Sequence, residues 1–131
     1  MIDKELLNKA IEAKKNAYAP YSKYPVGAAL LTKSGKVYTG CNIENVAYGL
    51  SNCAERTAVF KAVSEGESEF VAIAIAGNGP GFSFPCGACR QVLLEFAPKI
   101  KVIIGDEKGN YIKKELADLL PYPFEKESLK T

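Results

Sequence analysis

The segment Phe70–Ala76 (FVAIAIA) constrains the fold of this 131-residue chain more than any other. All seven residues are apolar, whereas a strand with one face in water alternates apolar and polar side chains. We therefore expect a strand that is buried on both faces. Because helices on both sides of a sheet provide that burial, the segment predicts an α/β architecture.

Apolar periodicity and turn residues divide the rest of the chain. An apolar stripe from Asp3 to about Tyr18 predicts a helix with Asp3 as its N-cap and Pro20 as its stop. We expect further helices over residues 53–65, 86–96 and 115–120, and strands over residues 26–32, 37–42, 70–76, 101–105 and 111–114. Strands that alternate with helices predict a mixed sheet with helices on both faces, partly parallel and with an antiparallel hairpin at one edge. The length favours a single domain, residues 1–131.

The charge balance excludes some classes of function. Lys and Arg number 17 and Asp and Glu number 15, so the formal net charge is +2. A balance so close to neutral argues against a protein whose main partner is the nucleic acid backbone. The longest apolar run is far shorter than the roughly 20 residues of a membrane helix. The first residues carry no apolar segment typical of a secretory signal, so we expect a cytoplasmic protein without membrane partners.

The chain contains four cysteines and no histidine. A Ser-His-Asp triad, a Cys-His pair or an imidazole metal ligand therefore cannot be built from it. In a reducing cytosol the four thiols are not expected to form disulfides. They are expected to be either small buried side chains or ligands.

Two of the cysteines, Cys86 and Cys89, form a P-C-G-A-C unit at the start of a predicted helix. Residues three apart on a helix face the same side, and a helix N-terminus favours a thiolate over a thiol. Two neighbouring thiolates make half of a zinc site. The same spacing also fits a thioredoxin-like redox pair, and spacing alone leaves metal and redox chemistry nearly even.

Cys53 favours the metal, because it begins another predicted helix and adds a third thiolate. Three protein ligands leave the fourth tetrahedral position of zinc open, which is typical of a catalytic site. If Cys41 were the fourth ligand, the metal would be structural and the chain a non-catalytic zinc-stabilised module. Since Cys41 has no C-x-x-C partner, we expect it to be a small core residue.

Three thiolates and Zn²⁺ sum to a charge of −1, which opposes the ionisation of a bound water. The chain has only two arginines, Arg56 and Arg90, and both lie beside the cysteines. We expect Arg56 to be the partner of a sulfur, with Gln91 as an orienting neighbour and Arg90 as a residue that could share the task. Glu55 is the candidate acid and base, although a glutamate in a first helical turn also has a purely structural reading.

These motifs together resemble a known pattern. C-A-E at residues 53–55 followed by P-C-G-A-C at residues 85–89 resembles the signature of zinc nucleoside and nucleobase deaminases, whose chemistry includes an all-cysteine variant. Over residues 15–120 the chain is similar to the small homotetrameric zinc-dependent cytidine deaminases. Four segments carry that similarity: A-P-Y-S-K-Y-P-V-G-A-A-L (19–30), G-C-N-I-E-N-V-A-Y-G (40–49), C-A-E-R-T-A (53–58) and P-C-G-A-C-R-Q-V (85–92).

The resemblance implies a three-layer αβα fold with a five-stranded mixed sheet and one Zn²⁺ per chain. It implies hydrolytic deamination of cytidine and 2′-deoxycytidine to uridine and 2′-deoxyuridine with release of ammonia, a reaction of pyrimidine salvage. It also implies a homotetramer whose sites are completed by neighbouring subunits. The implied residues are Cys53, Cys86 and Cys89 for zinc, Glu55 for proton transfer, Asn42 and Glu44 for the sugar hydroxyls, the backbone near Ala54 and residues 83–85 for the base edge, Tyr24 for the pyrimidine pocket and Phe124 for a neighbouring site.

One of these residues departs from the family, and some alternatives stay open. The family usually has Phe at the position of Tyr24, and tyrosine adds a hydroxyl that needs a partner. The nearest rival is a related small-molecule enzyme such as blasticidin S deaminase, although N-I-E-N at residues 42–45 suits a nucleoside sugar. From other classes, the rivals are the thioredoxin-like dithiol module and the non-catalytic zinc module.

Overall fold

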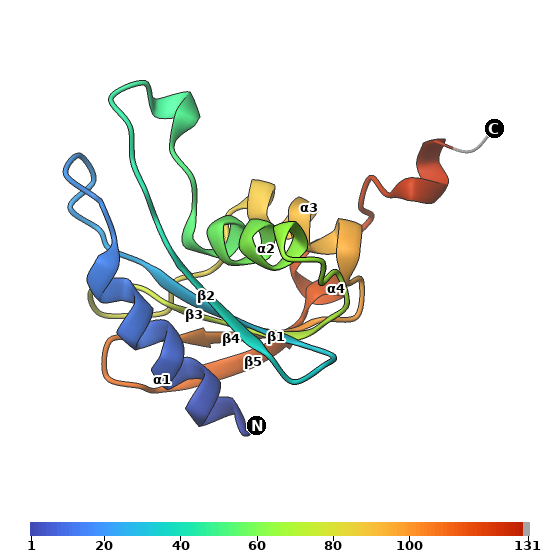
Figure 1. Ribbon diagram of the computed structural model, residues 1–131, viewed down its shortest axis with the longest axis horizontal. Helices are drawn as coiled ribbons and strands as arrows, with labels where there is room; N and C mark the ends of the chain where they lie inside the picture. The colour runs from blue at the N-terminus through green and yellow to red at the C-terminus, as the bar shows by residue number, and fades with distance from the viewer. Residues whose placement is uncertain (130–131) are drawn as a thin grey trace.

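The computed structural model describes residues 1–129, which form a five-stranded sheet in the order β2-β1-β3-β4-β5 with helices on both faces (Figure 1). The helices and strands follow the predicted order. Their bounds are α1 Asp3–Ala13, β1 Gly27–Thr32, β2 Val37–Cys41, α2 Ala54–Ser64, β3 Phe70–Ala76, α3 Gly87–Phe96, β4 Lys101–Gly105, β5 Tyr111–Glu115 and α4 Leu116–Leu119, with 3-10 turns at Lys14–Asn16, Tyr48–Leu50 and Lys126–Leu129.

The sheet is mixed, with antiparallel hairpins at both edges. Strand β1 pairs antiparallel with β2 and with β3, β3 pairs parallel with β4, and β4 pairs antiparallel with β5. Because β2 and β3 both run opposite to β1, they point in the same direction although β1 lies between them. The hairpin expected at one edge is therefore confirmed, and a second one closes the other edge.

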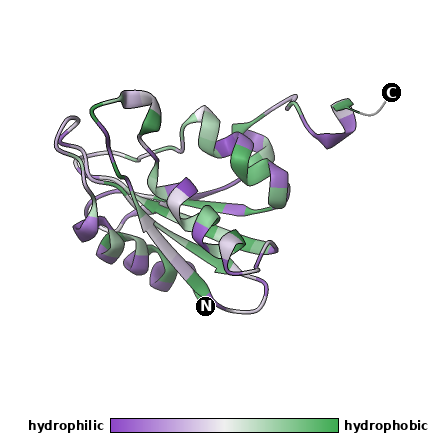
Figure 2. Ribbon diagram, turned by 45° about the horizontal axis from the view of Figure 1, so that its top comes forward, coloured by the Kyte–Doolittle hydropathy of each residue, from purple (hydrophilic) through white to green (hydrophobic). Residues whose placement is uncertain are grey.

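The central strand β3 separates two apolar layers. On one face its residues pack with α1 residues such as Leu7, and on the other face with α2 and α3 residues such as Val59 and Leu93. Figure 2 shows the strands mainly in the hydrophobic colour between helices that alternate in colour. The predicted burial on both faces holds from Ala72 to Ala76, while Val71, at the start of the strand, is 45% exposed. None of the helices among residues 1–129 has the length and apolar character needed to cross a membrane.

Two details of the first helix were predicted wrongly. Asp3 is the first residue of α1, and Ile2 occupies the N-cap position without a side-chain hydrogen bond. The helix ends at Ala13 and a 3-10 turn follows, because Tyr18 leaves the helical path to pair with Ile43. The Tyr18 N–H donates to Asn42 O at 2.9 Å, so pairing with a distant segment overrides the local apolar periodicity.

Helix α2 lies very close to strand β2 at Gly40. A Cβ atom built on Gly40 would lie 2.5 Å from Ala54 O and 2.6 Å from Ala58 N, and both of these are backbone atoms that cannot rotate away. Glycine at this position therefore sets how closely the first turn of α2 approaches the sheet. The residue just before that turn is Cys53.

We predict that Gly40→Ala destabilises the fold by about 1–3 kcal/mol, the usual cost of overpacking a tight contact. The matched control is Gly49→Ala, where a Cβ meets no atom within 4 Å, and its effect should stay within about 0.5 kcal/mol. Urea unfolding of both variants at one protein concentration measures the difference. Equal unfolding midpoints would show that the helix can shift away from the strand at no cost.

Candidate metal centre and active site

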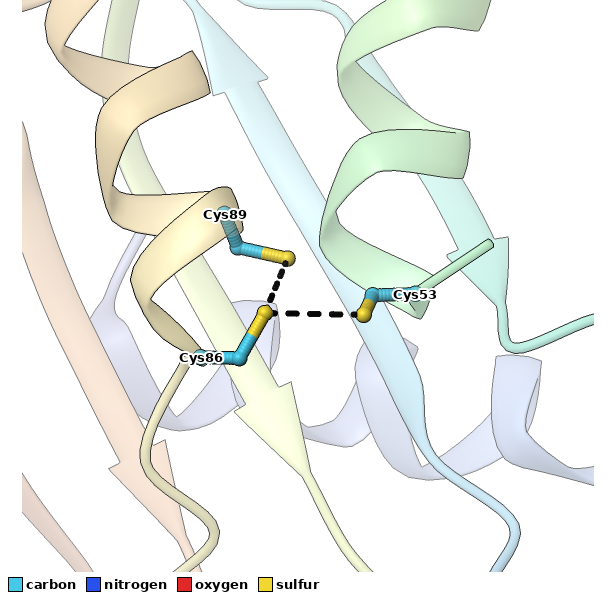
Figure 3. Close-up of side chains that lie close together, drawn as sticks. All are labelled: Cys53, Cys86 and Cys89. Carbon is cyan, nitrogen blue, oxygen red and sulfur yellow. Dashed lines mark hydrogen bonds between the residues drawn. The ribbon is translucent and has the colours of Figure 1, made fainter. Parts of the chain in front are cut away.

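Three cysteine sulfurs converge where α2 and α3 begin (Figure 3). Cys53 Sγ lies 3.7 Å from Cys86 Sγ, Cys86 Sγ lies 3.5 Å from Cys89 Sγ, and all three lie within 4.8 Å of one another. Zinc with Zn–S bonds of about 2.3 Å in tetrahedral geometry places its sulfurs about 3.8 Å apart. The spacing and the chemistry of these donors therefore fit one Zn²⁺ per chain.

The fold brings the sulfurs together through two helix N-termini. Cys53 is the N-cap residue of α2 and Cys86 is that of α3, while Cys89 lies in the first turn of α3. Since β2 and β3 run in the same direction, their carboxyl ends lie on the same side of the sheet. The helices that follow the two strands therefore start on that side. The unpaired N–H groups and the dipoles of both helices favour thiolates there.

Polar side chains that the sequence analysis missed hold Cys53 in place. Thr57 Oγ1 donates to Cys53 O at 3.1 Å and accepts from Asn52 Nδ2 at 3.2 Å. Asn52 also forms a bridge with Ile43, which anchors the chain just before the helix. A threonine four residues after a helix N-cap is a known pattern for bonding back to a carbonyl, and this pattern could have identified Thr57.

Arg56 provides the positive charge beside the sulfurs. Its Nη2 donates to Cys53 Sγ at 3.2 Å, and its buried Nε has no hydrogen-bond partner among the described residues. The pKa of Cys53 is lowered to about 5, first by a hydrogen bond from the Cys89 thiol and then by Arg56. The pKa of Cys89 is raised, because its proton is held by Cys53 and the side chain is buried. The pKa of Arg56 is raised by its hydrogen bond to Cys53.

The other predicted contributors to charge compensation are engaged elsewhere. Arg90 Nε donates to Pro85 O at 2.8 Å and its Nη1 donates to Leu119 O at 2.6 Å, so this arginine ties the start of α3 to α4. Gln91 Nε2 donates to Phe124 O at 2.6 Å, toward the C-terminal segment. These donors of Arg90 and Gln91 are bonded to backbone carbonyls, while the hydrogen bond to a cysteine sulfur comes from Arg56; a role of Arg90 or Gln91 in charge compensation stays a prediction.

Cys41 lies apart from the three sulfurs. It is the last residue of β2, where it pairs with Gly27, and its side chain is half-buried. Burial raises the pKa of its thiol, so it is less prone to ionise. Among residues 1–129, Cys53, Cys86 and Cys89 form the one group of three or more potential metal ligands. A four-cysteine structural site is therefore not what the fold assembles.

A cavity of about 410 Å³ opens beside the sulfurs, within the range typical of ligand sites. Its lining residues come from five parts of the chain and are Ser22, Tyr24, Val26, Asn42, Cys53, Ala54, Glu55, Ile75, Ser83, Phe84 and Cys86. Glu55, in the first turn of α2, is 5% exposed. Burial raises its pKa to about 7, with a further contribution from the Cys53 thiolate. A buried carboxyl thus shares this cavity with two of the three sulfurs.

The predicted sugar-binding residues border this cavity and the next one. Asn42 lines the cavity of the sulfurs, and Glu44 lines an adjoining cavity of about 340 Å³, with Ser22 shared by both. Asn42 Oδ1 accepts from Val26 N at 2.8 Å, and Glu44 Oε1 accepts from the N–H groups of Tyr21 and Ser22 at 3.0 and 3.1 Å. Both side chains therefore also hold the segment before β1.

The remaining predicted residues fall in two places. Tyr24 and Ala54 line the cavity of the sulfurs. Phe124 is 62% exposed and lies on the segment after α4, which runs away from the body of the chain (Figure 1). It is not among the residues that line the cavity of its own chain.

Comparison with known proteins identifies the pattern. A family model described as the cytidine and deoxycytidylate deaminase zinc-binding region matches residues 1–105. Two curated relatives, the cytidine deaminases of Sporosarcina psychrophila and Halalkalibacterium halodurans, are each 50% identical to this chain, over 126 and 125 residues. The alignments cover 95% of this chain and 93% and 95% of those proteins.

Solved structures agree with the sequence relatives. The crystal structure of cytidine deaminase from Burkholderia pseudomallei matches with a TM-score of 0.91 and 48% identity, covering 95% of this chain and 100% of that one. The cytidine deaminase from Mycobacterium tuberculosis matches with a TM-score of 0.81 and 40% identity, covering 95% and 98%. The chain therefore shares the five-stranded αβα fold of these proteins, as the resemblance implied.

We predict that replacing Cys53, Cys86 or Cys89 by Ser lowers the zinc content from about one ion per chain toward zero, because each removes one of three thiolate ligands. Cys41→Ser is the matched control and should keep its zinc. Metal analysis after dialysis against a weak chelator measures the content. Loss of zinc from the Cys41 variant would instead indicate a fourth sulfur ligand.

Proposed function

The chain belongs to the zinc-binding family of cytidine and deoxycytidylate deaminases, and from that premise we propose how its residues divide the work of the reaction. The chain is a hydrolase that deaminates cytidine in a zinc-dependent reaction. We further propose that 2′-deoxycytidine is a substrate and that the reaction serves pyrimidine salvage. The observation that best supports the division of work among the residues is the buried carboxyl of Glu55 in a cavity that is also lined by two of the three clustered cysteines.

Cys53, Cys86 and Cys89 are the residues that would hold the zinc. When bound, zinc acts as a Lewis acid that activates a water molecule for attack on the ring. The three sulfurs come from one side, the N-termini of α2 and α3, which leaves the side toward the cavity for water and substrate. This one-sided arrangement distinguishes the site from a closed structural one.

Glu55 carries the protons. Its carboxylate takes one proton from the attacking water as the C4–O bond forms, and delivers that proton to N3 of the cytosine ring. It then moves the remaining hydroxyl proton to the exocyclic nitrogen, the C4–N bond breaks, and ammonia leaves. The product keeps its proton on N3 and a carbonyl at C4, which is uridine. Glu55 is only 5% exposed, which suits a group that must exchange protons with the substrate and not with bulk water.

Arg56 balances the charge of the sulfurs. Three thiolates with one Zn²⁺ carry a net charge of −1, and the guanidinium that donates to Cys53 Sγ at 3.2 Å offsets it. Withdrawing electron density from that sulfur keeps the site electrophilic. Arg56 acts through the sulfur and is therefore a positioning and tuning residue.

Asn42 and Glu44 are proposed to bind the sugar. One hydrogen of Asn42 Nδ2 is used on Tyr24 O at 2.9 Å, and the amide has a second one to donate. Glu44 uses Oε1 on two backbone N–H groups, and a carboxylate has further acceptor positions for hydroxyls. The same two side chains would thus shape the pocket and contact the ribose.

Assembly and location are proposed from the family resemblance and the shape of the chain. The exposed Phe124 on its projecting segment is suited to reach the site of a neighbouring subunit in a homotetramer. The single domain of residues 1–131 would act in the cytoplasm, where free thiols persist. Membership of a hydrolytic family removes the reason to interpret Cys86 and Cys89 as a redox pair.

We predict that Glu55→Gln lowers kcat for cytidine by about 10²–10⁴-fold, since an amide cannot accept and deliver the protons. Its zinc content should stay near one per chain. The control is Glu12→Gln on the exposed face of α1, where the carboxylate pairs with Lys15, and it should leave kcat unchanged. The ultraviolet change on conversion of cytidine to uridine gives the rates. Near-normal turnover of the Glu55 variant would remove it from the reaction.

We predict that Arg56→Gln lowers activity about 10–100-fold, the usual effect of losing a partner of a metal ligand. Arg56→Lys should recover part of that loss, because lysine keeps the positive charge but not the planar pair of donors. Zinc content and kcat/KM are measured on both variants. If Gln and Lys at this position gave equal activity, charge would not be what Arg56 contributes.

A further inference from the structure

A hydrogen bond between two hydroxyl groups joins two separate segments that line the cavity. Tyr24 Oη lies 2.5 Å from Ser83 Oγ, although the residues are 59 positions apart in the chain. Tyr24 lies on the segment before β1, and Ser83 lies on the loop of residues 77–85 between β3 and α3, here called the rim loop. Both residues line the cavity of the sulfurs. The hydroxyl of Tyr24 therefore has a defined partner.

Tyr24 is held firmly on its own side of the cavity. Its N–H donates to Ser22 Oγ at 3.0 Å, and its carbonyl accepts from Asn42 Nδ2 at 2.9 Å. The preceding residue, Lys23, adopts a left-handed conformation with φ of 59°, which is uncommon outside glycine. The backbone of Tyr24 is thus fixed by hydrogen bonds on both sides, so its hydroxyl is a fixed point on the cavity wall.

The rim loop is held by side chains at its two ends, and at its last residue Arg90 Nε donates to Pro85 O at 2.8 Å. Its sequence is GNGPGFSFP, with Gly79 and Gly81 at positive φ, and its two phenylalanine rings are partly exposed. At its beginning, Lys14 Nζ donates to Gly77 O at 3.0 Å. The hydroxyl pair at Ser83 is an attachment near its other end, next to the residues that enter the metal centre.

Gly77 shows how closely the hydroxyl pair is packed. A Cβ atom at this position would lie 1.6 Å from Ser83 Oγ and 2.5 Å from Tyr24 Oη. Any side chain there would separate the two hydroxyls. The sequence therefore provides a tyrosine, a serine and a glycine that fit one another at the cavity rim.

We propose that the hydrogen bond between Tyr24 and Ser83 is a positioning device for the substrate, which sets the distance between the two walls that enclose the pyrimidine ring. The proposal rests on the proposed function, because it takes the cavity to be the nucleoside site. Tyr24 and Ser83 are positioning residues: they hold Phe84 and the end of the rim loop in the arrangement that accepts a flat ring.

Loss of the hydrogen bond between Tyr24 and Ser83 is expected to affect KM and not kcat. Without the hydrogen bond, the rim loop must become ordered each time a nucleoside binds, and that cost weakens binding. The cost is the same in the ground state and the transition state, so it raises KM and leaves kcat unchanged. The loss of one hydrogen bond between neutral groups corresponds to a rise in KM of about five-fold.

The test uses Tyr24→Phe, which keeps the ring, together with Ser83→Ala and the double variant. Each single change should raise KM for cytidine about five-fold, and the double variant should show no further increase, because both remove the same bond. The rise in KM relative to the parent should be the same for 2′-deoxycytidine, which differs from cytidine only in the sugar. Ser83→Thr keeps a hydroxyl and should restore KM. Tyr111→Phe on β5 is the matched control, since Tyr111 is exposed to a similar degree, 38% against 40% for Tyr24.

Hydrogen exchange of the peptide that contains residues 77–85 gives a readout independent of activity. It should be faster in Tyr24→Phe and Ser83→Ala than in the parent or the Tyr111 control. An unchanged exchange rate, an unchanged KM, or KM effects that multiply in the double variant would each overturn the proposal. If the parent chain did not deaminate cytidine, the proposed function would fail, and the exchange rates alone would still decide whether the bond holds the loop.

Discussion

Strands β2 and β3 run in the same direction with β1 between them, and the arrangement of the site depends on this constraint. Each strand is followed by a helix, so α2 and α3 both begin near the carboxyl ends of these two strands. Their N-termini carry the three cysteines, and the unpaired N–H groups and dipole of a helix N-terminus favour thiolates. A chain without histidine can in this way place three sulfur ligands on one side of a metal. The apolar strand β3 packs against α1 on one face and against α2 and α3 on the other.

The charge of such a site is the second constraint. Sulfur ligands bind zinc strongly but add negative charge where an electrophile is needed. The chain meets this with Arg56 at 3.2 Å from Cys53 Sγ, and it uses Arg90 instead to tie α3 to α4. Glu55 lies in the same first turn of α2 as Arg56, so one helical turn brings the proposed proton carrier and the proposed charge partner to the metal centre.

Much of the fold could be predicted from the sequence, because its signals are local. The run Phe70–Ala76 and the strand at Lys101–Gly105 have the predicted bounds, since turn residues border them closely. The end of α1 could not be predicted, because Tyr18 pairs with a segment 25 residues away in the sequence, at Ile43. The second hairpin, β4 with β5, was not predicted, because apolar periodicity does not specify which strands are neighbours in the sheet.

The site was predictable where spacing implies geometry, and not where partners lie far apart. Cys53, Cys86 and Cys89 were found because they sit at helix starts in a recognisable pattern. The bond from the Gln91 amide to Phe124 O could not be predicted, since the two residues are 33 positions apart in the chain. The bond between Tyr24 and Ser83 links two loops that no sequence spacing connects, although the unusual Tyr24 already called for a hydroxyl partner.

X-ray absorption at the zinc edge measures the ligands of the metal directly. We expect three sulfurs at about 2.3 Å and one oxygen at about 2.0 Å around each zinc of the purified chain. Four sulfurs would make the metal structural and place Cys41 or another sulfur in its shell. Either that result, or a spectrum with fewer than three sulfurs, would rule out an open zinc site held by Cys53, Cys86 and Cys89.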